Sequence, residues 1–327
     1  MVFGHTNKIL EEHVLKALIF AMLVPITAFA SNVNNVALVS SSTQFDDSQL
    51  PQIQQNLEQK GYSVSLQYLD QVISDFGYVN TDQKRAKDLI RALTDDNIDI
   101  LWFVRGGGGA LNLLPYLEQH KDELKSAKPK VLVGFSDVTA LHHFVNQELG
   151  WPSIHGVTAA TNLEMGGFNQ EPLPNISELL KNGVEYDYVL PLNDLAKTAK
   201  VNGTLVGGNH TLVAATFGTK YSYDLKNKVL LLEDVGVSFR QLDRLLQQIL
   251  FLNQFDVNAV IFGQYYPADP TDPERLMYKT VLERFAQQLN KPVYYFPFIG
   301  HGKYNRPVIL GHSVELSCKE EYCNLTQ

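Results

Sequence analysis

VLVGFSDVTAL, residues 131–141, is the stretch that decides the fold. A short apolar run, Val131–Val133, reaches Gly134 and presents Ser136 and Asp137 before a helix-like pattern begins. A strand, sharp turn and helix in this order lift a serine hydroxyl off the end of a sheet and point free helix N–H groups at whatever binds there. This is the layout of a nucleophile elbow, although Val138 stands where the G-x-S-x-G pattern has its second glycine. The alternative is that Ser136 only caps the following helix.

The residues before this stretch alternate between strand-like and helix-like patterns. Strands are predicted at residues 35–40, 62–68 and 98–104, and helices at residues 50–60 and 85–93. Such alternation indicates an α/β fold with a parallel sheet and right-handed crossovers. Loops that bind ligands are then expected at the carboxyl ends of the strands.

A glycine-rich loop follows the third predicted strand. Arg105 and Gly106–Gly109 lie directly after it, and glycines there let backbone N–H groups approach a ligand closely. The loop is a phosphate cradle, a donor loop for an oxyanion hole, or a tight turn without a ligand. The chain has no G-K-[ST] at this point, which argues against the first of these.

The second half of the chain predicts a smaller, mixed α/β domain. Residues 166–194 have the composition of a linker, so we expect an N-terminal doubly wound, mostly parallel domain over residues 31–165 and a C-terminal domain over residues 195–327. The latter contains a buried strand ending in Glu233 and Asp234, and an amphipathic helix over residues 238–251.

Charge and the first thirty residues bear on partners and location. The 327 residues carry a formal net charge of −8 without a Lys/Arg-rich run, so we expect a small molecule or peptide as the partner and no nucleic acid. Residues 1–30 resemble an export signal, with Lys8 and Lys16 before an apolar run that ends at Ala30. Cleavage after Ala30 would give a periplasmic or secreted protein with no membrane span; the alternative is a retained anchor.

The two cysteines, Cys318 and Cys323, lie near the C-terminus. In an oxidising compartment they are close enough in sequence to form a local disulfide, and the alternative is two free thiols. Neither has neighbours typical of a metal site.

A serine nucleophile needs a base, and a histidine base needs a carboxylate to orient it. His301, between Gly300 and Gly302, has the backbone freedom and exposure that suit a base, while His155, His210 and His312 remain open candidates. Side chains alternate across a strand, so one of Glu233 and Asp234 should face the site, and the strand pattern does not say which.

Five ordered motifs together carry a family resemblance. VRGGGGA, VGFSDVTAL, GTLVGGNHTLV, VLLLEDV with FRQLDRLLQQI, and PFIGH followed by RPVILG resemble, in order and spacing, the serine LD-carboxypeptidases. That family includes muropeptide LD-carboxypeptidases and microcin immunity peptidases. The resemblance spans about residues 36–315.

The resemblance implies a Ser-His-Glu triad with Ser136 as nucleophile, His301 as general base and Glu233 as the residue that orients it. It also implies an oxyanion hole made by the backbone N–H groups of Gly107 and Asp137, a homodimer, and no metal or cofactor. The expected reaction is hydrolysis of the L,D-amide before the C-terminal D-Ala of murein tetrapeptide, through an acyl-enzyme.

This chain departs from the family pattern at Gly108, where members usually carry an aromatic residue, most often Tyr. The departure bears on the substrate more than on the mechanism. Three alternatives follow: a peptidase acting on peptide–nucleotide amides, an exported muropeptide-binding protein without activity, and a nucleotide-binding module built on Gly106–Gly109.

Overall fold

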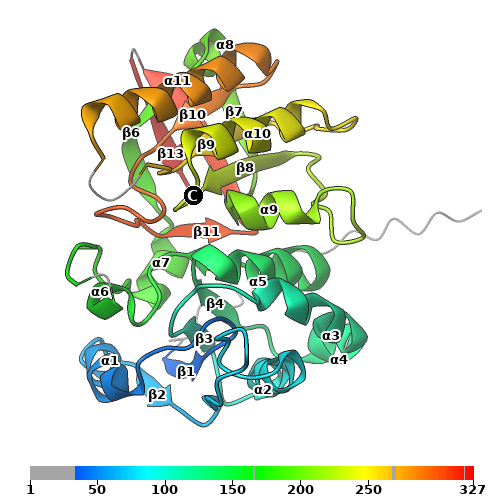
Figure 1. Cartoon of the computed structure of the whole chain (residues 1–327), viewed down its shortest axis with the longest axis vertical. Helices are drawn as coiled ribbons and strands as arrows, with labels where there is room; N and C mark the ends of the chain where they lie inside the picture. The colour runs from blue at the N-terminus through cyan, green and yellow to red at the C-terminus, as the bar shows by residue number, and fades with distance from the viewer. Residues whose placement is uncertain (1–33, 165, 267–269, 320) are drawn as a thin grey trace, which may run out of the picture.

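The computed structural model describes residues 34–164, 166–266, 270–319 and 321–327. The predicted export signal, residues 1–30, lies outside these ranges. Figure 1 shows two domains stacked along the long axis, with the early part of the chain below and the late part above. Within the described ranges, no helix combines the length and apolarity that a membrane crossing requires.

A mostly parallel sheet forms the centre of the first domain. Its strand order is β11-β5-β4-β3-β1-β2, parallel from β2 to β5, with β11 antiparallel to β5 at the edge. The predicted parallel sheet is therefore confirmed. The strands are β1 (Asn35–Val39), β2 (Ser63–Ser65), β3 (Ile100–Phe103), β4 (Val131–Gly134), β5 (Ser153–His155) and β11 (Val308–Leu310).

Helices cover both faces of this sheet, which makes it doubly wound. Along β1 the side chains alternate, so Ala37 and Val39 enter one hydrophobic core while Val36 and Leu38 enter the other. The helices are α1 (Leu50–Glu58), α2 (Asp82–Thr94), α3 (Leu114–Gln119), α4 (Lys121–Ser126), α5 (Thr139–Phe144), α6 (Thr161–Glu164) and α7 (Ile176–Asn182).

The second domain is a closed barrel with helices on its outside. The strand order is β10-β6-β13-β12-β7-β8-β9. Along β8, Val229 and Leu231 face the barrel core, and Leu230 and Leu232 pack against the core beneath the helices. The strands are β6 (Glu185–Pro191), β7 (Lys200–Asn209), β8 (Lys228–Glu233), β9 (Ala259–Phe262), β10 (Val293–Tyr295), β12 (Ser313–Lys319) and β13 (Tyr322–Thr326). The helices are α8 (Asp194–Thr198), α9 (His210–Thr216), α10 (Phe239–Leu250) and α11 (Asp272–Gln288).

The chain crosses between the domains more than once. The segment predicted as a linker, residues 166–194, contains α7 and β6, and β6 pairs with β10 and β13 in the barrel. In the opposite direction, β11 leaves the C-terminal half and completes the first sheet beside β5. Gln327 pairs its side-chain amide with the N–H and C=O of Ile309, at 2.9 and 2.7 Å, and so satisfies backbone groups of β11.

The two cysteines form a disulfide across the last hairpin. Cys318 on β12 and Cys323 on β13 are directly paired in the strand register and bonded to each other. The oxidised alternative that the sequence allows is therefore the one present in the structure.

Candidate active site

Ser136 occupies a sharp turn between β4 and α5. It opens a 3₁₀ helix, Ser136–Val138, and has a φ of 61°. A positive φ is uncommon for a residue with a side chain and persists where the surrounding structure enforces it, often at functional sites. A Cβ on Gly134 would lie 3.0 Å from Val138 Cγ2, so glycine allows the helix to start close to the strand. The predicted strand, sharp turn and helix are confirmed.

Glu233 and His301 meet on the barrel side of the domain boundary. Glu233 is the last residue of β8 and is fully buried, and His301 lies in the loop after β10. His301 Nδ1 is 2.8 Å from Glu233 Oε2. Burial alone raises the pKa of the Glu233 carboxyl, but the adjacent His301 and His155 outweigh it and lower this pKa to about 2. Glu233 is therefore a carboxylate throughout the physiological pH range.

Two glycines make room for this carboxylate. A Cβ on Gly263 would lie 2.9 Å from Glu233 Cβ, and one on Gly300 would lie 2.5 Å from Glu233 Oε2. Gly300 also has a φ of 112°, in the region that favours glycine. The G-H-G sequence around His301 thus serves the packing of Glu233 as well as the placement of the imidazole.

Hydrogen bonds from distant segments hold the loop that carries His301. Gly300 N donates to Asn305 Oδ1 at 2.9 Å, and Asn169 Nδ2 donates to Gly302 O at 2.9 Å. Asn169 comes from the segment predicted as a linker. Neither asparagine lies in a recognisable motif, so the sequence gives no signal of its role.

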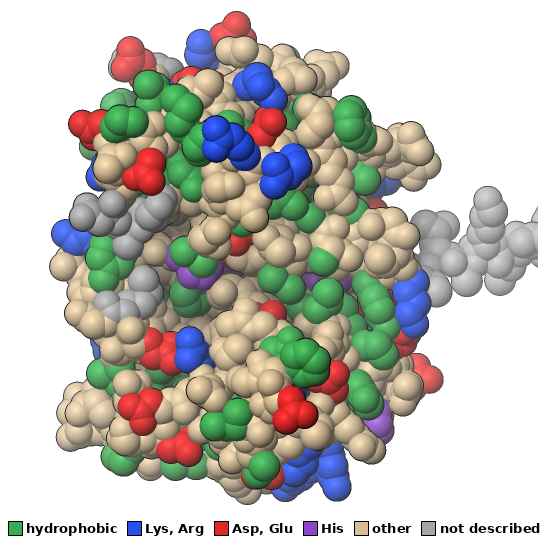
Figure 2. Space-filling view, in the orientation of Figure 1, with side chains coloured by type: hydrophobic (Ala, Val, Ile, Leu, Met, Phe, Trp, Pro, Cys, Tyr) green, Lys and Arg blue, Asp and Glu red, His purple; other side chains and the backbone are tan. Residues whose placement is uncertain are grey.

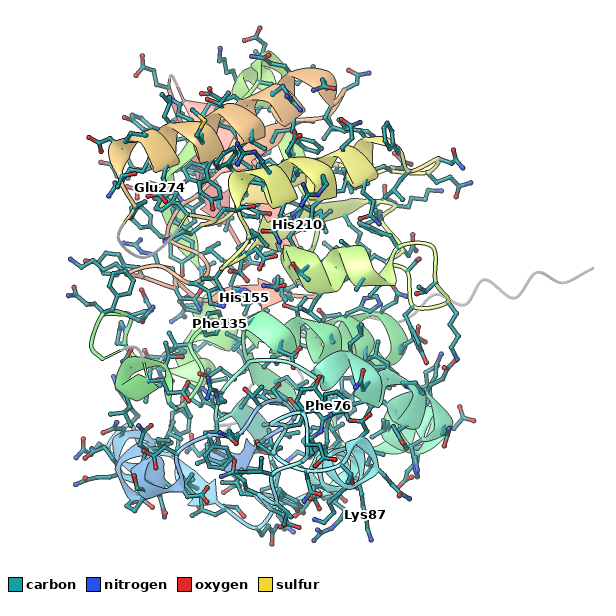
Figure 3. The ribbon with its side chains drawn as sticks, in the orientation of Figure 1. Phe76, Lys87, Phe135, His155, His210 and Glu274 are labelled. Carbon is teal, nitrogen blue, oxygen red and sulfur yellow. A yellow bond between two sulfur atoms is a disulfide. The ribbon has the colours of Figure 1, made fainter. Side chains whose placement is uncertain are left out.

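A second imidazole reaches Glu233 from the first domain. His155, the last residue of β5, is fully buried, and its Nε2 lies 3.5 Å from Glu233 Oε1. The sequence left His155 open as a base. Figure 3 shows His155 and Phe135 where the two domains meet, and the Phe135 ring lies 4.7 Å from the His301 ring.

Asp234, the other acid that the sequence left open, binds residues at the start of α9 instead of His301. Its carboxylate accepts hydrogen bonds from Asn209 Nδ2 at 2.9 Å and from Thr211 N and Oγ1 at 2.9 and 2.7 Å. These contacts hold the start of α9. The alternation along β8 therefore sends Glu233 to His301 and Asp234 to a helix N-terminus.

Three further described histidines have other partners, whereas His312, also left open by the sequence, has a buried Nδ1 without a hydrogen-bond partner in the described part of the chain. His142 Nε2 lies 2.9 Å from Gly134 O, and His143 Nε2 lies 2.7 Å from Tyr221 O. His210 Nδ1 lies 3.0 Å from the Tyr265 hydroxyl oxygen, at the start of α9 in the second domain. Burial lowers the pKa of His142 and His210 to about 3, so both are neutral near pH 7. His5 and His13 lie outside the described residues.

The glycine loop lies against the elbow. A Cβ on Gly106 would lie 2.9 Å from Ser136 Cβ and 3.5 Å from Asp137 N. Gly107 has a φ of 121°, and a Cβ there would overlap the Thr43 side chain, whose Oγ1 donates to Gly106 O at 3.0 Å. The close approach of Thr43 explains why this loop position requires glycine.

The Asp137 side chain links the serine turn to the glycine loop and to the loop after β1. It is 2% exposed, and its Oδ2 accepts from Ser42 Oγ at 2.7 Å and from Ala110 N at 2.9 Å. One carboxyl group therefore ties together the loops that follow β1, β3 and β4.

An aromatic ring from another loop lies beside Gly108. Tyr78 Cε1 would be 3.7 Å from a Cβ on Gly108, and the Arg85 guanidinium stacks over the Tyr78 ring at 4.7 Å. Gly108 replaces the aromatic residue that is usual in the family, and nothing in the sequence pattern links it to Tyr78, which lies thirty positions earlier in the chain. Only the fold brings the two together.

Ser136 follows Phe135, whose ring contacts that of His301, and His301 in turn contacts Glu233, so the three residues lie near one boundary between the domains. Figure 2 shows histidine atoms in the recess between the lower and upper halves. Among the described residues no hydrogen bond joins Ser136 to His301, and no group of three His, Cys, Asp or Glu side chains is arranged to hold a metal ion.

The serine turn and the buried Glu233–His301 pair lie on the two sides of the domain boundary, and comparison with known proteins specifies the family. The model of the LD-carboxypeptidase N-terminal domain matches residues 36–156, and that of the C-terminal domain matches residues 202–316. The chain belongs to the LD-carboxypeptidase family of serine carboxypeptidases.

Two relatives in other bacteria support the assignment. A Rickettsia conorii protein assigned to the carboxypeptidases by name is 37% identical over 258 residues, covering 74% of this chain and 76% of the relative. The murein tetrapeptide carboxypeptidase of Pseudomonas aeruginosa is 32% identical over 238 residues, covering 69% and 75%.

Solved structures confirm the fold. The muramoyltetrapeptide carboxypeptidase of Oxalobacter formigenes has a TM-score of 0.74 at 23% identity, with 90% of this chain and 98% of that chain covered. A microcin-immunity-like protein of Streptococcus pneumoniae has a TM-score of 0.70 at 23% identity, with 90% and 99% covered.

Proposed function

We propose that this protein is an LD-carboxypeptidase that removes the C-terminal D-Ala of murein tetrapeptide, with Ser136, His301 and Glu233 as its triad. The observation that carries the proposal is the 2.8 Å contact between His301 and the buried, ionised Glu233. This pair lies across the domain boundary from a serine held at a φ of 61°.

The reaction proceeds by acyl transfer. Ser136 Oγ attacks the carbonyl carbon of the amide before D-Ala while His301 Nε2 takes the hydroxyl proton. His301 then gives that proton to the leaving amine, the C–N bond breaks, and free D-Ala departs. Water, deprotonated by His301, hydrolyses the ester, and Ser136 regains its proton. Glu233 stabilises the imidazolium in both halves and keeps Nδ1 protonated.

The tetrahedral oxyanion forms beside the elbow, where the glycine loop and the start of the 3₁₀ helix are adjacent. We assign its donors to the backbone N–H groups of Gly107 and Asp137. An oxyanion donor typically lowers the barrier by about 3 kcal/mol. The packing of Gly106 against Ser136 and the Asp137 side-chain bonds support this assignment.

The substrate proposal draws on the relatives, since the Pseudomonas aeruginosa protein is a murein tetrapeptide carboxypeptidase. Peptides joined to nucleotides are the competing class, because the Escherichia coli microcin C7 self-immunity protein is also a relative, 23% identical over 240 residues. An exported, catalytically inactive muropeptide-binding protein is the third possibility that the test addresses.

Mass spectrometry of murein tetrapeptide incubated with the protein tests the proposal, beside the Ser136→Ala variant. We expect loss of one D-Ala with the wild type and no product above background with Ser136→Ala, which should remain folded by circular dichroism. Product from Ser136→Ala would contradict the assigned nucleophile. If an aminoacyl-nucleotide mimic is hydrolysed and tetrapeptide is not, the substrate proposal is wrong and the triad stands.

We also propose that the protein is exported after cleavage behind Ala30 and forms a homodimer. The signal-like residues 1–30 and the disulfide between Cys318 and Cys323 support export, because disulfides persist in oxidising compartments. Mature protein recovered from a cell-envelope fraction should begin at Ser31. Sedimentation equilibrium of that protein should give twice the chain mass.

A further inference from the structure

The two carboxylate oxygens of Glu233 have different surroundings. Oε2 receives the 2.8 Å contact from His301 Nδ1. Oε1 has no hydrogen-bond partner among the described residues, yet His155 Nε2 lies 3.5 Å from it. Both ring nitrogens of His155 also lack hydrogen-bond partners in that part of the chain, and both side chains are fully buried.

Because both side chains are buried, water cannot replace a missing hydrogen bond between them. A buried polar atom without a hydrogen-bond partner is destabilising, and more so when it belongs to a charged group. Bringing Nε2 to Oε1 requires a movement of about 0.5 Å to reach an ordinary hydrogen-bond length. Glu233 Oε1 and His155 Nε2 face each other, so one short movement of a side chain gives each of these two atoms a hydrogen-bond partner.

We propose that His155 is a positioning residue: its Nε2–H holds Glu233 Oε1, so that Oε2 stays directed at His301. The proposal deepens the proposed function and rests on the roles given there to Glu233 and His301. Glu233 then has two imidazole neighbours. His301 exchanges protons with Ser136 and the substrate, and His155 does not.

The backbone around His155 is rigid enough for this role. β5 lies between two partners, so His155 pairs with Gly134 on β4 and with Val308 on β11. Gly208 of the barrel approaches from the other side, and a Cβ there would lie 3.3 Å from His155 Cδ2. The ring is therefore fixed to the sheet that also carries Ser136.

The contact spans the boundary between the domains. Ser136 and His155 belong to the first domain, whereas Glu233 and His301 belong to the second. By binding Glu233, His155 fixes the acid–base pair relative to the domain that supplies the nucleophile. This sets the distance across which His301 must reach Ser136.

Other titratable groups near Glu233 and His155 also affect how activity depends on pH. Besides His301 and His155, Glu233 interacts electrostatically with Asp234, the next residue in the chain, and with Tyr265 after β9. His142 on α5 interacts in the same way with His155. Burial raises the pKa of Asp234 and of Tyr265, and burial lowers that of His142 to about 3. Of these groups, His155 is the one that places a ring nitrogen 3.5 Å from Oε1.

The test compares His155→Leu with His155→Gln, because Gln places an amide N–H near the position of Nε2 and Leu has none. We expect His155→Leu to lower kcat about 10- to 100-fold with little change in KM, since misplacing a catalytic group by a fraction of an ångström carries losses of this size. The acid limb of its kcat/KM profile should move to higher pH, because Glu233 loses a donor that competes for its negative charge. His155→Gln should retain kcat within about threefold and the wild-type profile.

His210→Leu is the matched control, since His210 is equally buried and contacts Tyr265 rather than Glu233. It should lower the melting temperature and leave the pH profile in place. If His155→Leu keeps the wild-type kcat and profile, or if Gln is as impaired as Leu, the positioning role is wrong.

A second measurement does not depend on catalysis. The melting temperatures of His155→Leu, Glu233→Gln and the double variant should be non-additive, because the second substitution removes a contact already lost. Additive shifts would overturn the proposal even if no substrate is found. Conversely, non-additive shifts without tetrapeptide hydrolysis would place the failure in the proposed function alone.

Discussion

Glu233 is ionised in the core because imidazoles and small residues surround it. A buried carboxylate is costly unless it is paired, and this one has His301 and His155 as neighbours. The lack of side chains at Gly263 and Gly300 leaves it the room to reach them. The residues beside the acid thus matter as much to the site as the acid itself.

Gly300→Ala tests that packing at a single atom. The new Cβ would lie 2.5 Å from Glu233 Oε2 at a φ of 112°, so the carboxylate must move away from His301. We expect kcat for tetrapeptide hydrolysis to fall about 100-fold. Gly218→Ala is the control, because Gly218 has a φ of 77° with nothing within 4 Å of its Cβ position. That variant should lose about 1 kcal/mol of stability and no activity; equal losses of activity in the two would show that strain alone is responsible.

The low pKa of Glu233 predicts how stability depends on pH. The pKa is about 2 in the folded protein, where His301 and His155 outweigh the effect of burial, and about 4.3 in an unfolded chain. The unfolded state therefore binds the proton first as pH falls, so this stabilisation is present above about pH 4.3 and is lost toward pH 2. Urea unfolding of the wild type and of Glu233→Gln at pH 7, 5, 4 and 3 measures the difference. The difference in unfolding free energy between the wild type and Glu233→Gln should become smaller as pH falls. A difference that is the same at every pH would contradict the lowered pKa of Glu233.

Among the elements, the loops after β1, β3 and β4 act as one unit because Asp137 ties them together. Ser42 follows β1, Ala110 follows the glycine loop, and both donate to Asp137 Oδ2. Parallel strands place these three loops at one sheet edge, as expected for a ligand site in such a sheet. The site is thus assembled by strand order before any substrate binds.

Asp137→Ala should release the glycine loop from the elbow. We expect kcat to fall about 100-fold, the size typical for loss of one oxyanion donor, with KM changed less. Ser42→Ala removes only one of the two bonds and leaves the Ala110 bond intact, so its loss should be smaller. Steady-state kinetics of both variants decides the matter, and a larger effect of Ser42→Ala would show that Asp137 is not the link.

The local sequence pattern predicted most helices and strands but not which strands pair with each other. Alternating and helical periodicities in the sequence correspond to β1, β3, β4, β8, α2 and α10. The apolar residues of β11 resemble any closing strand, yet β11 pairs with β5 of the first sheet. Likewise β6 lies in a segment of linker composition. Which sheet a short strand joins is decided by tertiary contacts, which local composition does not encode.

At the scale of the whole molecule, the site exists only where the domains meet. The motif resemblance pointed to Ser136, Glu233 and His301, and the strand pattern alone left Glu233 and Asp234 equivalent. His155 and Tyr78 gained no role from the sequence, because their neighbours, Glu233 and Gly108, are distant in the chain and come close only through the packing of separate strands and loops.

The same separation predicts that the disulfide stabilises the barrel without serving catalysis. Cys318 and Cys323 join β12 to β13, and neither strand carries Ser136, Glu233 or His301. A five-residue separation closes a small loop, for which chain entropy gives about 2 kcal/mol of stabilisation. The Cys318→Ala/Cys323→Ala protein should lose about that much unfolding free energy and keep its kcat. Urea unfolding and tetrapeptide hydrolysis, with and without reductant, measure both. Because the double variant has no disulfide to reduce, reductant should destabilise only the wild type; a fall in kcat with either treatment would mean that the hairpin supports the domain boundary as well as the barrel.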